Sequence, residues 1–131
     1  MNRTIFSTGM LIGVLGIILG AFGAHGLENL LDADALRTFE TGVKYQMYHA
    51  IFLLVLGGTG LLPSKKKRLP FYLILAGIFL FSFSIYFLAT NTLTGFDFKT
   101  IGFVTPIGGL LLILGWIVTG YHVWKSESVK K

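Results

Sequence analysis

The chain has 131 residues, of which 53% are hydrophobic and 13% charged, with a formal net charge of +5. A soluble domain of this size does not hide so much apolar surface, so the composition excludes an ordinary soluble protein and indicates a membrane protein. The chain contains no cysteine, which excludes disulfides, thiolate metal sites and a thiol nucleophile.

The charged residues lie in clusters that leave four long stretches without Asp, Glu, Lys or Arg. These stretches are residues 4–27, 45–64, 69–96 and 100–124. Each has at least 20 residues, which is enough for a helix to cross a hydrocarbon core of about 30 Å. The sequence therefore predicts a single all-α domain over residues 1–131, an integral membrane four-helix transmembrane bundle.

We expect the membrane-spanning helices at about 4–24, 45–62, 69–90 and 101–124. Pro63 predicts the end of the second helix, and Pro70 fits the first turn of the third. The first span also looks like a secretory signal peptide. However, its apolar stretch is longer than a usual signal core, and three more spans follow.

An amphipathic segment, about 33–44, precedes the second span. Its apolar residues recur at helical spacing among charged ones. Asp32 or Asp34 is the expected N-cap. We predict that this segment lies at the membrane interface and runs on into the second helix.

Five glycines in the first span are three or four residues apart: Gly9, Gly13, Gly16, Gly20 and Gly23. At 3.6 residues per turn, they fall within a stripe about 80° wide. Glycine lowers helix stability in water by about 1 kcal/mol relative to alanine, so helix propensity does not explain them. Because small residues let helix backbones approach closely in membranes, we interpret the stripe as a helix-packing face.

The basic residues predict the orientation of the chain in the cell (plasma) membrane. The connection between the second and third spans contains Lys65, Lys66, Lys67 and Arg68. This run and the two chain ends hold eight of the 11 basic residues. The positive-inside rule therefore places both termini in the cytoplasm. Beyond this topology signal, the run is a candidate site for anionic lipid.

The polar side chains of the spans gather, by residue count, in the outer half of the bundle. They are His25, Tyr45, Gln46, His49, Ser82, Tyr86 and Thr105. Polar groups in a bilayer need partners and usually face the bundle interior. We expect His49 to be buried, with a hydrogen-bond partner on another helix: Ser82, Tyr86 or Thr105. His122 fits an aromatic belt at the inner interface and should be more exposed.

Four interpretations of this polar cluster remain open. The first is interhelical hydrogen bonding, which would fix how the helices pack. The second is a polar cavity for a solute, a proton or a lipid headgroup. A third interpretation is a metal or haem site using His25 and His49, for which two histidines are a weak signature. The fourth is a hydrolase using Ser82 or Ser84, but no nucleophile elbow is present. We assign no catalytic residue, metal or cofactor.

Four motifs occur in order along the chain. They are Gly20-Ala-Phe-Gly-Ala-His-Gly-Leu27, Phe39-x-Thr-Gly-Val-x-Tyr-Gln-x-Tyr-His-Ala50, Leu80-Phe-Ser-x-Ser-x-Tyr86, and Phe103-Val-Thr-Pro-Ile-Gly-Gly109 with Gly115-Trp116. With these motifs the chain resembles the YwdK/YgdD-type small bacterial membrane proteins, the family of the domain of unknown function 423. The resemblance implies a four-helix membrane protein of uncharacterised function, and it implies no activity or substrate.

The sequence thus favours a non-enzymatic multi-pass membrane protein, either a packing or assembly partner or a small binding or transport module. The expected partners are the lipid bilayer, anionic lipid, and a second copy or another membrane protein. Nucleic acid is not expected, because topology accounts for the placement of the positive charges. The alternative is an intramembrane enzyme or a redox or haem component that uses His25 and His49.

Overall fold

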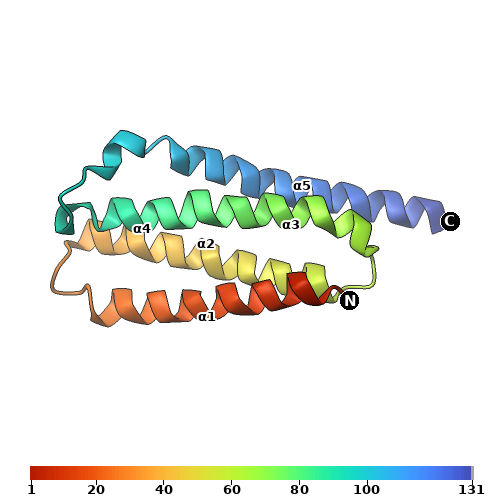
Figure 1. The fold of residues 1–131 in the computed structure, drawn as a ribbon, viewed down its shortest axis with the longest axis horizontal. Helices are drawn as coiled ribbons and strands as arrows, with labels where there is room; N and C mark the ends of the chain where they lie inside the picture. Colours follow the sequence, from red (N-terminus) through yellow and green to blue (C-terminus); the bar gives the residue numbers. More distant parts are fainter. Residues whose placement is uncertain (131) are drawn as a thin grey trace.

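The computed structural model describes residues 1–130, with side chains to residue 126, and over this range it is helical without strands. Its main elements are α1 (Arg3–His25), α2 (Ala33–Gly58), α3 (Ser64–Ile78), the π-helix η1 (Phe79–Phe83), α4 (Ser84–Ala89) and α5 (Val104–Lys130). Because α3, η1 and α4 follow one another without a break, they form one composite rod. The described residues therefore make four antiparallel rods, with the start of α1 and the end of α5 at the same end (Figure 1).

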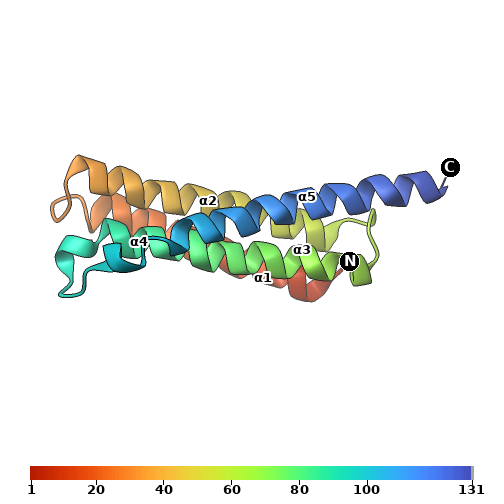
Figure 2. The same cartoon turned by 90° about the horizontal axis from the view of Figure 1, so that it is seen from above.

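The four rods form a staggered row. α1 packs on α2, α2 packs on the composite rod, and the composite rod packs on α5. Consequently α1 and α5 are the two edges of the row (Figure 1). Figure 2 shows α5 running obliquely across α2 and the composite rod. This row differs from a closed bundle, in which the first and last rods would also pack extensively on each other.

Three of the rods are long and apolar enough to cross a membrane. They comprise residues Arg3–His25, Ser64–Ala89 and Phe98–Ser126. α2 is as long as these rods, but its first half carries charged and polar side chains that lower its hydropathy. The edge rods expose large apolar side chains, such as Ile17 at 65% and Ile117 at 59%. Such surfaces suit contact with lipid rather than with water.

α1 and α2 approach closely along the glycines of α1. A Cβ atom added at Gly9 would lie 2.9 Å from the carbonyl oxygen of Ala50, and one at Gly23 would lie 2.7 Å from the ring of Phe39. At Gly16 the added atom would lie 2.5 Å from the sulfur of Met47. Gly13 and Gly20 also face α2, at looser distances of 3.8 and 3.3 Å. Larger side chains at the tight positions would push the two helices apart.

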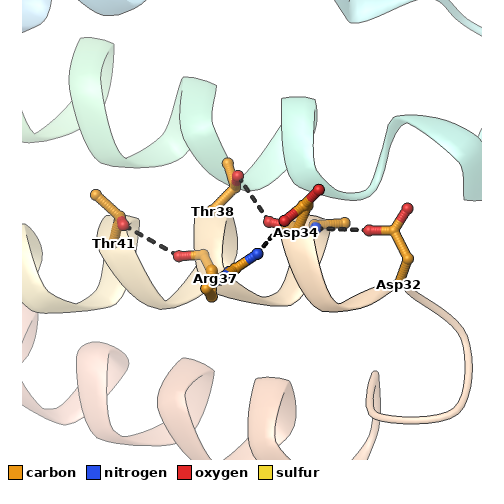
Figure 3. Close-up of polar contacts among 6 residues, drawn as sticks. Asp32, Asp34, Arg37, Thr38 and Thr41 are labelled. Carbon is orange, nitrogen blue, oxygen red and sulfur yellow. Dashed lines mark hydrogen bonds and ion pairs between the residues drawn. The ribbon is translucent and has the colours of Figure 1, made fainter.

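The first turns of α2 are stabilised by the chain's own polar groups (Figure 3). The Asp32 carboxylate caps the helix by accepting a hydrogen bond from the Ala35 backbone N–H at 2.7 Å. Asp34 forms an ion pair with Arg37, one turn further along. Segment 33–44 is therefore the beginning of one continuous helix that ends at Gly58, four residues earlier than the expected limit of the second span.

The basic run is also helical, because α3 begins at Ser64 after the N-cap Pro63. Pro70 consequently lies in the second turn of α3, not in the first. A proline there cannot donate a hydrogen bond to the carbonyl four residues earlier, that of Lys66. His122 of α5 supplies the missing donor, since its Nδ1 lies 3.0 Å from the Lys66 carbonyl oxygen. This contact fastens the end of α5 to the start of α3.

Candidate functional site

A buried glutamine joins three of the four rods. Gln46 of α2 is fully buried. Its amide nitrogen donates to the carbonyl oxygen of Ile12 on α1 at 3.0 Å, and its amide oxygen accepts from the hydroxyl of Tyr86 on α4 at 2.5 Å. Both ends of the side chain are thereby occupied. The arrangement fixes how α1, α2 and α4 lie against one another.

Two serines, Ser82 in the π-helix and Ser84 at the start of α4, bond to different neighbouring rods. The Ser82 hydroxyl donates to the carbonyl oxygen of Gly42 on α2 at 2.9 Å. The Ser84 hydroxyl forms a hydrogen bond of 2.6 Å with the Thr105 hydroxyl at the start of α5. A π-turn holds one more residue per turn than an α-turn, so it changes which side chains face each neighbour. Together the two serines fasten the composite rod to α2 and to α5.

His49 links α2 to α5. Its ring is 4% exposed, and its Nε2 accepts a hydrogen bond from the indole N–H of Trp116 at 3.0 Å. Its Nδ1 lies 2.7 Å from the carbonyl oxygen of Tyr45, one turn earlier in α2. Both bonds are satisfied together by a neutral ring that carries its proton on Nδ1. His49 is therefore buried and bonded to a neighbouring helix, but the partner is Trp116 rather than Ser82, Tyr86 or Thr105.

A groove of about 530 Å³ lies between α2 and α5, with the composite rod beneath it. Its lining residues are Tyr45, His49, Phe81, Gly109, Leu112, Ile113, Trp116 and Ile117. Tyr45 and Trp116 are 41% and 53% exposed, so the groove opens sideways. No charged residue lines it. Its polar atoms belong to the His49–Trp116 bond and to Tyr45, whose hydroxyl has no hydrogen-bond partner among the described residues.

Lys67 has a different role from the rest of the basic run. Its side chain is 1% exposed, and its ammonium donates to the carbonyl oxygens of Thr59 at 2.7 Å and Gly57 at 3.3 Å. These carbonyls lie at the end of α2, where backbone acceptors lack helical donors and the helix dipole favours a cation. Lys67 therefore ties α3 to the end of α2, and it is not accessible to lipid.

The expected polar cluster divides into separate groups. Gln46, Ser82 and Tyr86 form the interior network described above, whereas Tyr45 and His49 line the groove and Thr105 pairs with Ser84. His25 is exposed at the end of α1 and belongs to none of them.

The placement of His25 and His49 does not suit a shared metal or haem. Gly13 of α1 faces Ala50, the residue after His49. His25 lies twelve residues beyond Gly13, about 18 Å along the helix axis. Among residues 1–126, whose side chains are described, the structure contains no group of three or more metal-ligating His, Asp or Glu side chains.

The comparisons with known proteins agree with the motifs. The family described as "Protein of unknown function (DUF423)" matches residues 19–109. The chain belongs to the DUF423 family. Its resemblance to that family, inferred from the four motifs, is thereby confirmed.

The relatives of this DUF423 protein are named as membrane proteins. A "UPF0382 membrane protein" of Haemophilus influenzae is 42% identical, over 91% of this chain and 92% of the relative. One from Staphylococcus saprophyticus is 41% identical, over 84% of this chain and 88% of the relative. "UPF0382 membrane protein YwdK" of Bacillus subtilis is 38% identical, over 84% and 87% respectively. No solved structure matches the chain significantly.

Sequence reasoning missed several residues of this DUF423 site. Trp116 offered a signal, because a tryptophan deep within a span, away from the interfacial belt, needs a partner for its N–H. Pro70 offered another, since a proline inside a helix frees a carbonyl that some donor must satisfy. Nothing in the sequence distinguished Lys67 from its basic neighbours. Only its direction on α3, toward the end of α2, separates it from them.

Proposed function

We propose that this DUF423 protein is a non-enzymatic multi-pass protein of the cell membrane, with four spanning rods and both termini in the cytoplasm. Support comes from the four charge-free stretches and from the eight of 11 basic residues on the side of the termini. In the charge-free part of α2, spanning is compatible with the polar side chains because Gln46 and His49 bond to neighbouring rods. The charged side chains at the start of α2, such as Lys44, are exposed and suit the membrane interface.

Labelling of single cysteines tests this topology directly, because the natural chain has no cysteine. Ser64→Cys lies at the end that holds the termini, and Gly95→Cys lies in the opposite connection, where an added Cβ meets nothing within 4 Å. A membrane-impermeant maleimide should label Gly95→Cys in intact cells and Ser64→Cys only after permeabilisation. The reverse pattern would overturn the orientation, and labelling of both in intact cells would overturn the four-span arrangement.

The interior polar network supports a role in packing rather than in solute transport. Among the described residues, every buried side-chain nitrogen or oxygen has a hydrogen-bond partner. A solute pathway needs polar groups that exchange partners with the solute, and Gln46, Ser82 and Tyr86 already use theirs on neighbouring helices. Since the interior network has no free polar group for a ligand, we place any ligand binding in the groove between α2 and α5.

We infer that the groove binds the alkyl chain of an amphiphile drawn from the bilayer. The observation that carries this proposal is the volume of about 530 Å³ with a lining free of charged side chains. Ligand pockets typically measure about 300–1,000 Å³ and are mostly apolar, with a few polar groups that orient the ligand. From Gly109 to Ile117 the groove follows α5 for about 12 Å. The unpaired Tyr45 hydroxyl is available to the polar group of the ligand.

Tryptophan fluorescence tests the groove. In a Trp124→Phe background, Trp116 is the only tryptophan, and it lines the groove. A fatty acid brominated along its chain should quench it with a saturable dependence on probe concentration. Gly109→Leu, which fills the groove, should weaken this quenching about tenfold. Gly120→Leu, on the same helix but with open space around it, should not.

Two results would contradict the proposal. Quenching that rises linearly and equally in both leucine variants would show partitioning into the surrounding detergent rather than binding. Haem absorbance or stoichiometric metal in the purified protein would instead favour the redox alternative.

A further inference from the structure

Three cations of the basic run point away from the protein interior. On a helix, successive residues are 100° apart, so the burial of Lys67 against α2 turns its neighbours outward. Lys65 and Arg68 are exposed, and Lys66 is half-buried. None of the three forms an ion pair with a described residue. The run thus consists of one structural lysine and three cations that face the surroundings.

The end of α5 completes this surface. His122 donates its Nδ1–H to the Lys66 carbonyl oxygen that Pro70 leaves free. This bond holds the last turns of α5 against the first turn of α3. The ammonium of Lys125, one turn further along α5, lies 5.5 Å from the centre of the Tyr121 ring. We define the basic patch as Lys65, Lys66 and Arg68 of α3, which lie beside the turn of α5 that holds His122.

The positive charge at the start of α3 is not balanced by any group of the helix itself, so an anion from outside would stabilise it. The first turn of α3 contains no acidic residue, and no side chain caps its free N–H groups. Cations there are unfavourable, because the helix dipole already makes this end positive. α2 provides a contrast within the same molecule, since its first turn has the Asp32 cap and the acidic Asp34 (Figure 3). The first turn of α3 instead has basic residues, and it lacks both an acidic residue and a side-chain cap.

The position of the patch identifies the anion. The apolar rod Ser64–Ala89 begins at this turn, and the rod Phe98–Ser126 ends beside it. Tyr121 and Trp124, both largely exposed, lie at the same end, where aromatic side chains anchor to lipid headgroups. We propose that the basic patch binds the phosphate group of an anionic phospholipid. This proposal does not depend on the groove, which lies further along α5.

Lipid binding by the purified full chain tests this proposal. Native mass spectrometry would compare phosphatidylglycerol with phosphatidylcholine of the same acyl chains, and the wild type should bind phosphatidylglycerol more tightly. Each basic side chain near an anionic surface contributes about fivefold in affinity, so three contribute about 100-fold. The triple variant Lys65→Gln, Lys66→Gln, Arg68→Gln should therefore lose most of the preference. The matched triple variant Arg37→Gln, Lys44→Gln, Lys99→Gln, at the opposite end, should keep it.

Two further measurements keep the proposal open to refutation if the glutamine variant does not fold. The charge-preserving variant Lys65→Arg, Lys66→Arg, Arg68→Lys should retain the preference. In the wild type, the preference should fall with salt, because the Debye length shrinks from about 10 Å at 0.1 M to about 3 Å at 1 M. The proposal would be overturned if the preference for phosphatidylglycerol did not depend on salt, or if the two triple glutamine variants lost this preference equally. Displacement of the lipid by millimolar inorganic phosphate would show a site for free phosphate instead.

Discussion

The hydrogen bond between Gln46 and Tyr86 should couple α2 and α4 energetically. Gln46 is completely buried and Tyr86 is 6% exposed, so neither side chain has access to solvent in place of its partner. Gln46→Leu keeps a side chain of similar size but removes the bonds to Tyr86 and Ile12. It also leaves the Tyr86 hydroxyl buried without an acceptor.

The magnitudes follow from these contacts. An interhelical hydrogen bond in a membrane protein contributes about 0.6 kcal/mol, and a buried polar group left unpaired costs about 1–3 kcal/mol. Gln46→Leu should therefore lower the free energy of unfolding by about 2–3 kcal/mol. Tyr86→Phe, which leaves only the amide oxygen of Gln46 unpaired, should lower it by about 1–2 kcal/mol. In the double variant neither polar group is left buried without a partner. The decrease in the free energy of unfolding should therefore be at least about 1 kcal/mol smaller than the sum of the decreases in the two single variants.

Equilibrium unfolding in mixed dodecyl maltoside and dodecyl sulfate micelles, followed by helical circular dichroism, measures these differences. As a control pair, Gln46→Leu should combine additively with Thr119→Val, because Thr119 bonds only to Gly115 of its own helix. Losses for the Gln46 and Tyr86 variants that add within about 0.5 kcal/mol would refute the coupling. They would show that this buried contact contributes nothing beyond the packing of the two side chains.

Two further substitutions test the contacts between the rods. Gly9→Leu should lower the free energy of unfolding by about 2 kcal/mol or more, because the new side chain meets the backbone of Ala50 and Leu54. Gly120→Leu should change it by less than about 0.5 kcal/mol, and equal effects of the two would contradict close packing at Gly9. Lys67→Met, which keeps the length of the side chain but not its bonds to the end of α2, should cost about 1.5–3 kcal/mol. The same change at exposed Lys65 is the control, and a neutral result at Lys67 would show that its two hydrogen bonds do not stabilise the fold.

The helices were largely predictable, since their extents depend on local composition. α1 runs from Arg3 to His25, against an expected 4–24. The main differences arise where helices extend past the charge-free stretches. α2 starts at Ala33 because the Asp32 cap begins the helix there, and α3 starts at Ser64 because the basic residues are good helix formers. Charge marks the limits of an apolar stretch, but it does not end a helix.

The partners of individual side chains were much less predictable. His49 was expected to bond to Ser82, Tyr86 or Thr105, and it bonds to Trp116. A helix in a bilayer is apolar all round, so hydrophobic periodicity does not say which face packs on which neighbour. The π-turn at Phe79–Phe83 adds a second uncertainty, because it changes which residues of the composite rod face α2 and α5.

Charge-free apolar stretches and ordered motifs are properties of the chain alone, so they were enough to predict a helical membrane protein of the DUF423 family. The packing of the rods was needed to show that they form an open row, that a groove lies between α2 and α5, and that Lys67 is buried while its neighbours are not. The physical reason is that lipid solvates any apolar helix face equally well. The choice among faces therefore depends on close fit and on hydrogen bonds between distant residues, which exist only once the rods have packed.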